Sequence, residues 1–482
     1  MRREAADPSA RGPGSGALLD RILAIRGIAA GERETFLKPS LAQMGHPSEM
    51  PGMRAAAEAF LEAVREGRRI AIYGDYDVDG VMASTILWHL AGALGAEPPQ
   101  VYIPHRIEEG YGLNRGALER LREDGAELVV TVDCGVAAPD EAAYARELGL
   151  ELVITDHHEP RGDGRLPEAR AVVHPRVLGA SGFGELCGAA VAWKLAWMTL
   201  EVWHGIARER PDEPQRARLP EVHRRALLHW LAFAAVGTVA DIVPLVGENR
   251  AIVAGGLPLV HLTGNAGMDA LLAEARLEGA RVDAEAVAFQ LAPRINAAGR
   301  MRHASLAADL FTSADAREAA ARARELSRLN DQRRRDDRAI FEDAVGRVES
   351  RLGVAGLVKS GLVKSGLVES SLVESSLIES KPAKTAKSAT APRGIVLWDD
   401  REEDGWSLGI VGIVCSKLVE RFACPTVLLT RAHDGFRGSG RSVDGIDLHG
   451  ILESCSEHLT HFGGHAMAAG MGVADLAALE RF

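Results

Sequence analysis

Residues 70–80 read Ile70-Ala-Ile-Tyr-Gly-Asp-Tyr-Asp-Val-Asp-Gly80, an apolar run that leads directly into three carboxylates. In a strand, side chains two positions apart share a face, so Asp75, Asp77 and Asp79 are expected to point the same way. Carboxylates a few ångströms apart cannot all ionise cheaply, which predicts a cation among them. Hard divalent ions such as Mg²⁺ and Mn²⁺ prefer carboxylate oxygens. The alternative for this segment alone is a solvated acidic turn.

The chain outward from this segment repeats one order of elements: a short apolar strand, polar residues, then a helical stretch. Strands are predicted at 69–73, 100–103, 127–132, 151–155 and 171–173, and helices at 81–94 and 140–148. Strands that alternate with helices imply βαβ units. We therefore predict an α/β fold, built on a parallel sheet with helices on both faces.

In sheets of this kind, ligands collect outside the carboxyl ends of the strands. The predicted third strand ends at Asp133, and the fourth ends at Asp156-His157-His158. Further along, a predicted buried helix at 221–240 ends at Asp241. The candidate metal ligands are therefore Asp75, Asp77, Asp79, Asp133, His157 and Asp241. Carboxylate and imidazole ligands without a thiolate favour Mn²⁺ or Mg²⁺ over a structural Zn²⁺.

This ligand set is suited to two metal ions. Two ions about 3.5–4 Å apart can share a bridging carboxylate and activate water for in-line attack on phosphorus. Asp133 is the bridging candidate, and Asp156 is expected to orient one imidazole from behind. An isolated histidine more often has a structural role, but His157 ends a strand beside the other acids, which favours a ligand.

The bulk properties limit the class of protein. At 482 residues and 46% hydrophobic content, two or three globular domains are expected. The sequence contains no run of about 18 apolar residues, so no membrane span is predicted. The net charge of −11 argues against general nucleic-acid binding, although it leaves room for a local basic groove. Five cysteines without a Cys-x-x-Cys pair support neither a disulfide framework nor a zinc–cysteine site, which fits a reducing cytoplasm.

Composition divides the chain into five parts. We predict an N-terminal tail and cap at 1–50, a catalytic domain at 51–312, a connecting helix at 313–352, a repeat linker at 353–393 and a smaller α/β domain at 394–482. Residues 1–16 lack the apolar stretch of a secretory signal, and Ser313 is expected to cap the connecting helix. Between 356 and 380 a unit of the form Gly-Leu-Val-Lys-Ser recurs, whose period of five matches neither a helix nor a strand. A flexible linker is therefore expected.

Glycine and arginine gather at three further places. Turns are predicted at 438–442 and 462–466 in the smaller domain, and at 294–300, which carries Arg294 and Arg300. Glycines let backbone N–H groups approach an anion, and Arg441 offers a bidentate fork for phosphate. An ordinary tight turn is the alternative at 438–442. Metal ligands in one domain and arginines in another favour a cleft that holds a phosphodiester.

Four segments resemble the motifs of the DHH phosphoesterase superfamily: 75–80, 133–135, 156–158 and 237–241. Four more narrow the resemblance to the RecJ family of single-stranded-DNA-specific 5′→3′ exonucleases: 104–114, 294–300, 438–442 and 462–470. The resemblance runs from about Leu18 to the C-terminus, apart from the repeat. It implies a DHH domain, a long linking helix and a smaller α/β domain of the DHHA1 type.

The same resemblance implies roles for individual residues. Asp77, Asp79, Asp133, His157 and Asp241 would hold two Mn²⁺ or Mg²⁺ ions, with Asp75 as a supporting carboxylate and His158 on the scissile phosphate. The residues expected to bind the 5′ end are Arg106, Ser439 and Arg441, and those expected along the strand are Arg294, Asn296, Arg300, Gly463, Gly464 and His465. The implied product is 5′-mononucleotides, formed in DNA recombination and repair. The implied partners are single-stranded DNA and a helicase or single-strand-binding protein, with no membrane.

Three features depart from the family pattern. Trp406-Ser407 stands where the family has Trp-His, and the segment 353–393 lengthens the tether between domains. The chain stops at Phe482, whereas family members continue into an OB-fold that grips single-stranded DNA. An active but weakly binding and poorly processive nuclease is therefore expected.

Two other functions are compatible with the superfamily. One is a DHH phosphodiesterase of short oligonucleotides or cyclic dinucleotides, against which the length of the chain and the segment 294–300 argue. The other is a non-catalytic DHH scaffold in a replication complex, which has no need of six candidate metal ligands.

Overall fold

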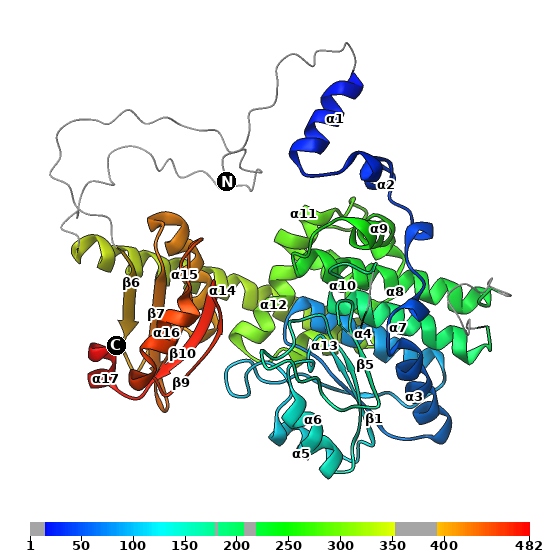
Figure 1. The fold of residues 1–482 in the computed structure, drawn as a ribbon, viewed down its shortest axis with the longest axis horizontal. Helices are drawn as coiled ribbons and strands as arrows, with labels where there is room; N and C mark the ends of the chain where they lie inside the picture. The colour runs from blue at the N-terminus through cyan, green and yellow to red at the C-terminus, as the bar shows by residue number, and fades with distance from the viewer. Residues whose placement is uncertain (1–14, 178, 180–181, 207–217, 352–392) are drawn as a thin grey trace. The chain divides into compact units, whose positions relative to one another are not determined.

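The computed structural model describes residues 15–177, 179, 182–206, 218–351 and 393–482 (Figure 1). Two compact units divide the chain, Met1–Asn330 and Asp331–Phe482, and their boundary falls within helix α14 (Ala316–Arg351). The predicted tail at 1–16 and the predicted repeat linker lie almost wholly outside the described residues. The domain limits drawn from the sequence stay predictions.

The first unit is built on a parallel sheet with the strand order β2-β1-β3-β4-β5. Its strands are β1 (Ile70–Tyr73), β2 (Gln100–Tyr102), β3 (Leu128–Val132), β4 (Glu151–Thr155) and β5 (Ala171–Val173). Every neighbouring pair is parallel, with Ile72 opposite Val130 and Val130 opposite Val153. The predicted α/β fold with a parallel sheet is confirmed.

Side chains alternate between two buried faces of this sheet. Ile72 and Val130 belong to a large core shared with α3 (Met53–Glu66), α4 (Val78–Ala93) and α7 (Gly188–Trp203). Tyr73, Val129 and Ile154 belong to a second core, shared with α5 (Arg115–Glu123) and α6 (Pro139–Glu147). Burying one such aliphatic side chain stabilises the fold by about 1.5–3 kcal/mol. Helices therefore cover both faces (Figure 1), and they hold the carboxyl ends of the strands in fixed places.

The remainder of the first unit is helical. The predicted buried helix is α8 (Glu221–Ala240), at the predicted limits, and it packs against α4, α7 and α9 (Gly247–Gly256). The other helices are α1 (Ser15–Ile25), α2 (Arg33–Leu37), α10 (Ala266–Glu274), α11 (Ala284–Ala286), α12 (Ala292–Met301) and α13 (Ser305–Thr312). None of the helices in the described part of this unit is long and apolar enough to cross a membrane, and the same holds for the second unit.

Two local predictions in this region are wrong. Segment 294–300 lies inside α12 and is not a turn, because Pro293 is tolerated in the first turn of the helix and Ile295 is buried in the core. Ser313 does not cap α14. The Asp315 carboxylate accepts hydrogen bonds from the backbone N–H groups of Arg317 (2.6 Å) and Glu318 (3.2 Å).

The second unit contains a mixed sheet with the order β6-β7-β8-β10-β9. Strand β6 (Ile395–Asp399) is parallel to β7 (Thr426–Ala432), and the pairs that follow are antiparallel. The remaining elements are β8 (Gly435–Arg441), β9 (His461–His465), β10 (Ala468–Val473), α15 (Leu408–Phe422), α16 (Leu448–Ser454) and α17 (Leu476–Arg481). This is the smaller α/β unit that the sequence predicts.

The two glycine-rich segments of this unit are strands, so their prediction as turns is wrong. Segment 438–442 begins within β8, and 462–466 lies largely within β9. A Cβ on Gly438 would overlap the Leu428 carbonyl oxygen, and one on Gly440 would lie 2.8 Å from Leu448. Glycine is needed here because neighbouring atoms approach the strand closely.

Candidate metal centre

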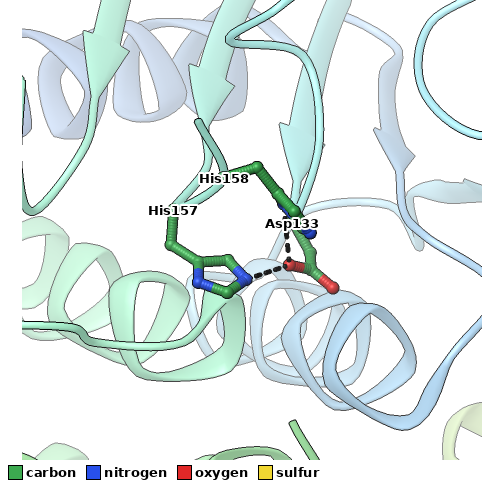
Figure 2. Close-up of side chains that lie close together, drawn as sticks. All are labelled: Asp133, His157 and His158. Carbon is green, nitrogen blue, oxygen red and sulfur yellow. Dashed lines mark ion pairs between the residues drawn. The ribbon is translucent and has the colours of Figure 1, made fainter. Parts of the chain in front are cut away.

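The carboxyl ends of β3 and β4 place a carboxylate against two imidazoles. Figure 2 shows Asp133 beside His157 and His158, with one carboxylate oxygen directed at the His157 ring. The distance from Asp133 Oδ1 is 3.0 Å to His157 Nε2 and 3.8 Å to His158 Nδ1. Residues that follow two different strands therefore meet at one edge of the sheet, as the predicted topology requires.

All six predicted metal ligands lie in this region. Their ligand atoms form three overlapping groups, within each of which the atoms lie no more than 4.8 Å apart. The groups are Asp133, His157 and His158; Asp79, His157 and Asp241; and Asp75, Asp77 and Asp133. Asp133 and His157 each belong to two groups and so connect the whole cluster.

The carboxylates of Asp75, Asp77 and Asp79 lie close together, but not because they alternate along a strand. Strand β1 ends at Tyr73 and α4 begins at Val78, so these residues occupy a loop and a helix start and no strand. Asp77 caps α4, because its Oδ1 accepts hydrogen bonds from the backbone N–H groups of Asp79 (2.8 Å) and Gly80 (3.1 Å). The argument from strand alternation is wrong, although the three carboxylates do lie close together.

The backbone of α7 orients the Asp79 carboxylate. The N–H groups of Gly188 and Ala189 donate to it at 2.5 and 3.0 Å, which uses donors that the first turn of a helix leaves free. A Cβ on Gly188 would lie 2.6 Å from Asp133 Cβ, and one on Gly237 would lie 2.5 Å from Asp79 Oδ1. Two helices thus reach the cluster because they present glycine to it.

Asp133 has a strained backbone, with a φ of 62°. Its N–H donates to the Thr155 carbonyl at 3.0 Å, and its own carbonyl accepts from the Tyr111 hydroxyl at 3.1 Å. Such strain persists only where neighbouring contacts hold it, and it concentrates at functional sites. These contacts aim the Asp133 carboxylate into the cluster.

Asp156 is a buried hydrogen-bond acceptor behind the two histidines. Its Oδ1 accepts from the backbone N–H groups of His157 (2.7 Å) and His158 (3.1 Å), and Oδ2 accepts from that of Val136 (2.9 Å). Burial disfavours its charge, but the hydrogen bonds from His158 and Val136 lower the pKa of Asp156 below its ordinary value. Asp156 is therefore ionised at neutral pH.

The imidazole that Asp156 holds is that of His158. His158 Nδ1 lies 2.9 Å from Asp156 Oδ1, and because an ionised carboxylate only accepts, Nδ1 carries the proton. Burial opposes the charged ring, but the hydrogen bond and charge of Asp156 raise the pKa of His158 to about 9. Burial lowers the pKa of His157, which keeps that ring neutral and available as a ligand.

The electrostatics of the cluster fit a bound cation. Burial and neighbouring carboxylates raise the pKa values of Asp75, Asp77 and Asp133, and they raise the pKa of Asp241 to about 8. Four buried atoms of this cluster make no hydrogen bond to the described residues: Asp75 Oδ1, Asp133 Oδ1, His157 Nε2 and Asp241 Oδ2. Buried polar atoms are rarely left in this state. Hard oxygen donors with one imidazole are a set that suits Mn²⁺ or Mg²⁺.

The predicted substrate residues of the first unit lie on one loop and one helix. The Arg106 guanidinium lies 4.6 Å from the centre of the Tyr76 ring, one residue from Asp75. Arg294, Asn296 and Arg300 lie on α12, where Arg294 donates to the Ser327 hydroxyl at 3.2 Å. Asn296 and Arg300 are four positions apart and so share one face of the helix.

Four of the predicted substrate residues of the second unit share one face of its sheet: Ser439, Arg441, Gly463 and His465. Arg441 donates to the Ser439 hydroxyl at 2.9 Å, and Ser439 lies opposite Gly470, which in turn lies opposite Gly463. Gly464 follows with a φ of 139°, and His465 is exposed at the end of β9. Gly463 has no atom within 4 Å of its Cβ position, so this side of β9 is open.

Some contributors to the site were not predicted from the sequence. The Tyr111 hydroxyl contacts both Asp133 and His158, and the α7 N–H groups bind Asp79. Tyr111 lies within segment 104–114, whose resemblance to the RecJ family was a usable signal. The only signal for α7 was a run of small residues at 188–190 before an apolar helix.

Trp406 has a structural role in the second unit. Its indole N–H donates to Asp343 at 2.9 Å, and its backbone N–H donates to Asp399 at 2.7 Å. Ser407 follows at the start of α15 and lines a cavity of about 440 Å³. An altered polar contact at Ser407 stays a prediction.

The parallel α/β sheet with aspartate and histidine side chains at its carboxyl edge places the chain among DHH-domain proteins. The model of the DHH family, N-terminal domain, matches residues 69–219, and that of the DHHA1 domain matches residues 393–482. More narrowly, the chain belongs to the RecJ family. It is 37% identical to the single-stranded-DNA-specific exonuclease RecJ of Bacillus subtilis and 32% identical to that of Salmonella typhimurium. These alignments cover 94% and 98% of the chain, but only 50% and 75% of the relatives.

Solved structures give the same result. A crystal structure of exonuclease RecJ bound to manganese matches with a TM-score of 0.67 and 31% identity, over 88% of this chain and 90% of that one. RecJ from Thermus thermophilus in complex with Mn²⁺ matches with a TM-score of 0.69 and 30% identity, over 94% of this chain and 56% of that one. The chain spans about half the length of the Bacillus and Thermus relatives.

Proposed function

We propose that the chain is a metal-dependent exonuclease that degrades single-stranded DNA from the 5′ end to 5′-mononucleotides in recombination and repair. The observation that carries the proposal is the set of four buried ligand atoms that make no hydrogen bond to the described residues, in a member of the RecJ family. Relatives whose structures contain manganese support the same reading.

The proposed ligands of two Mn²⁺ or Mg²⁺ ions are Asp75, Asp77, Asp79, Asp133, His157 and Asp241. Asp133 is the proposed bridge, because it belongs to two of the three ligand groups. Divalent ions there would lower the pKa of a bound water and stabilise charge on the phosphate. The chain's own contribution is to hold the carboxylates in place through the α7 N–H groups and the Asp133 backbone contacts.

His158 and the arginines have separate proposed tasks. With its Nδ1 proton held toward Asp156 and a pKa of about 9, His158 is charged at neutral pH and directs its other nitrogen at the scissile phosphate. Arg106, Ser439 and Arg441 would bind the 5′ phosphate, for which a guanidinium fork is well suited. The residues proposed along the strand are Arg294, Asn296, Arg300, Gly463, Gly464 and His465.

Two alternatives remain distinguishable by experiment. A phosphodiesterase of dinucleotides would not use the three polar side chains on α12. A scaffold would not keep buried ligand atoms that make no hydrogen bond in the described part of the chain. The test is incubation of labelled single-stranded DNA of graded length with Mn²⁺ or with EDTA. The proposal expects 5′-mononucleotides from long strands with Mn²⁺, none in EDTA and none from Asp133→Ala. Cleavage of dinucleotides alone would favour the first alternative, and no cleavage the second.

A cytoplasmic location and a helicase or single-strand-binding partner are also proposed. The five cysteines are all free thiols, which supports a reducing compartment. Co-purification of the tagged chain with a helicase from gently lysed cells would support the partner, and recovery of the chain alone would count against it.

A further inference from the structure

The residue after Asp241 has an unusual backbone. Helix α8 ends at Ala240, Asp241 is its C-cap, and Ile242 follows with a φ of 62°. Helices commonly end with a left-handed residue at this position, but it is usually glycine. A β-branched side chain with positive φ is a genuine outlier. Among the non-glycine residues described with positive φ, Ile242 is the one that is β-branched.

Packing does not explain the choice of isoleucine. Ile242 is 88% exposed, whereas the next residue, Val243, packs against the core. Val246 on the same loop is also exposed, at 48%, but its backbone is extended with a φ of −123°. The strain at Ile242 is therefore not offset by burial of its side chain.

The position of Ile242 connects it to the metal centre. Its neighbour Asp241 belongs to the group formed with Asp79 and His157, and Asp241 Oδ2 lies 3.6 Å from His157 Nε2. Consecutive α-carbons are about 3.8 Å apart, so the backbone of Ile242 lies at the rim of the cluster, and its side chain is exposed there. A nucleotide with its phosphate bound at the cluster would bring its base close to that rim. Strained residues cluster where they contact ligands.

We propose that Ile242 packs against the nucleobase next to the scissile phosphate, an inference that rests on the proposed function. An aliphatic side chain against the face of a base makes a contact without hydrogen bonds. It therefore excludes water and accepts any of the four bases. An exonuclease that degrades DNA of any base sequence requires such a contact. The Ile242 side chain is exposed and forms no part of the core, so it is available for this contact.

The replacement Ile242→Gly tests the proposal, because it moves stability and activity in opposite directions. Glycine relieves the backbone strain, so Tm is expected to rise by roughly 1–3 °C. The lost base contact is expected to lower kcat/KM on single-stranded DNA by roughly 5- to 20-fold, mainly through KM. The matched control is Val246→Ala, an exposed aliphatic residue of the same loop with an ordinary backbone. It is expected to change neither quantity.

An abasic substrate identifies the contacted group. The substrate carries abasic residues on both sides of the scissile bond. On this DNA, the ratio of the wild-type kcat/KM to that of Ile242→Gly is expected to fall to about one. An unchanged kcat/KM for Ile242→Gly, or a ratio that persists on abasic DNA, would overturn the proposal. Should the wild type release no nucleotides, the proposed function fails, and fluorescence anisotropy with labelled DNA in EDTA decides this inference. A several-fold weaker Kd for Ile242→Gly supports it, and an equal Kd refutes it.

Discussion

The Tyr111 hydroxyl joins two parts of the metal centre. It lies 2.8 Å from His158 Nδ1 and donates to the Asp133 carbonyl at 3.1 Å, so it steadies both the strained Asp133 backbone and the His158 ring. Groups that orient ligands commonly contribute 10- to 100-fold to activity or metal affinity. We therefore expect Tyr111→Phe to lower kcat by about 10-fold with little change in Tm. Steady-state kinetics on single-stranded DNA measures this loss.

Tyr144→Phe is the matched control, because Tyr144 makes its hydroxyl contact with Glu119 on the outer helices. It should leave kcat and its Mn²⁺ dependence unchanged. A Tyr111→Phe variant with wild-type kcat would show that Asp133 and His158 hold their positions without the hydroxyl.

Gly237 shows how one missing Cβ shapes the site. A methyl group there would lie 2.5 Å from Asp79 Oδ1 and 2.7 Å from Ala189 Cβ. Gly237→Ala is expected to cost about 1–3 kcal/mol of stability through overpacking, and to abolish most activity by displacing Asp79. Gly92→Ala on α4 is the control, since its Cβ would meet nothing within 4 Å, and it should add roughly 0.5–1 kcal/mol. Denaturant unfolding and activity assays on both variants check these expectations. Equal free energies of unfolding and equal activities for Gly237→Ala and Gly92→Ala would contradict them.

At the scale of elements, the pattern of apolar and polar residues predicted the strands of the first sheet and one buried helix. Strands β1 to β5 and helix α8 came from runs of apolar residues between polar ends, and these patterns depend on the local sequence alone. Helix α7 was missed, because its role depends on its first turn meeting Asp79 from more than 100 positions away. Glycines in β8 and β9 looked like turns, because a close approach by another strand leaves the same signature as a bend.

The candidate ligands were predictable for a related reason. Asp133 and His157 end neighbouring strands, and parallel topology alone brings such ends together. Strand topology does not predict that Tyr111 reaches the site. Its contact with Asp133 depends on how the loop 104–112 folds, and hydrogen bonds from Tyr111 to Asp133 and from Tyr102 to Glu109 tie this loop to residues outside it.

Glu109 is the centre of that loop. Its carboxylate accepts from the Tyr102 hydroxyl at 2.6 Å and from the His105 N–H at 2.5 Å, and it pairs with Arg120. Because the loop carries Arg106, Glu109→Ala is expected to raise KM for 5′-phosphorylated DNA by about 5- to 10-fold while kcat changes little. Hydrogen exchange of the amides at 105–107 should accelerate together with this change.

The neighbouring Glu108→Ala is a close control, because Glu108 is 78% exposed and its carboxylate lies 3.9 Å from the His105 ring. It should alter neither exchange nor KM. Unchanged exchange in Glu109→Ala would mean that the loop is held from elsewhere.

The whole molecule has a net charge of −11, and its acidic cluster concentrates part of this negative charge at one place in the fold. The carboxylates repel one another in the folded state, whereas in the unfolded chain they are dispersed. The fold of the first unit therefore carries an electrostatic cost at this point that a divalent cation removes. Binding of a cation to the folded state alone stabilises it by about 2.7 kcal/mol at a hundredfold excess over Kd.

The sign of the pH dependence follows from Asp241, whose pKa is raised to about 8 by burial and by Asp79 and Asp77. Between its unfolded value near 4 and about 8, the folded state binds the extra proton, so metal-free stability falls as pH rises through this window. In EDTA, Tm is expected to be higher at pH 6 than at pH 8.5, and saturating Mn²⁺ should raise Tm most at pH 8.5. Asp241→Asn, which removes the charge, should flatten the profile in EDTA and raise metal-free Tm at pH 8.5 above that of the wild type. Thermal unfolding in which Mn²⁺ changes Tm equally at both pH values, or in which Asp241→Asn destabilises the metal-free protein at pH 8.5, would show that repulsion at this cluster does not limit the stability of the fold.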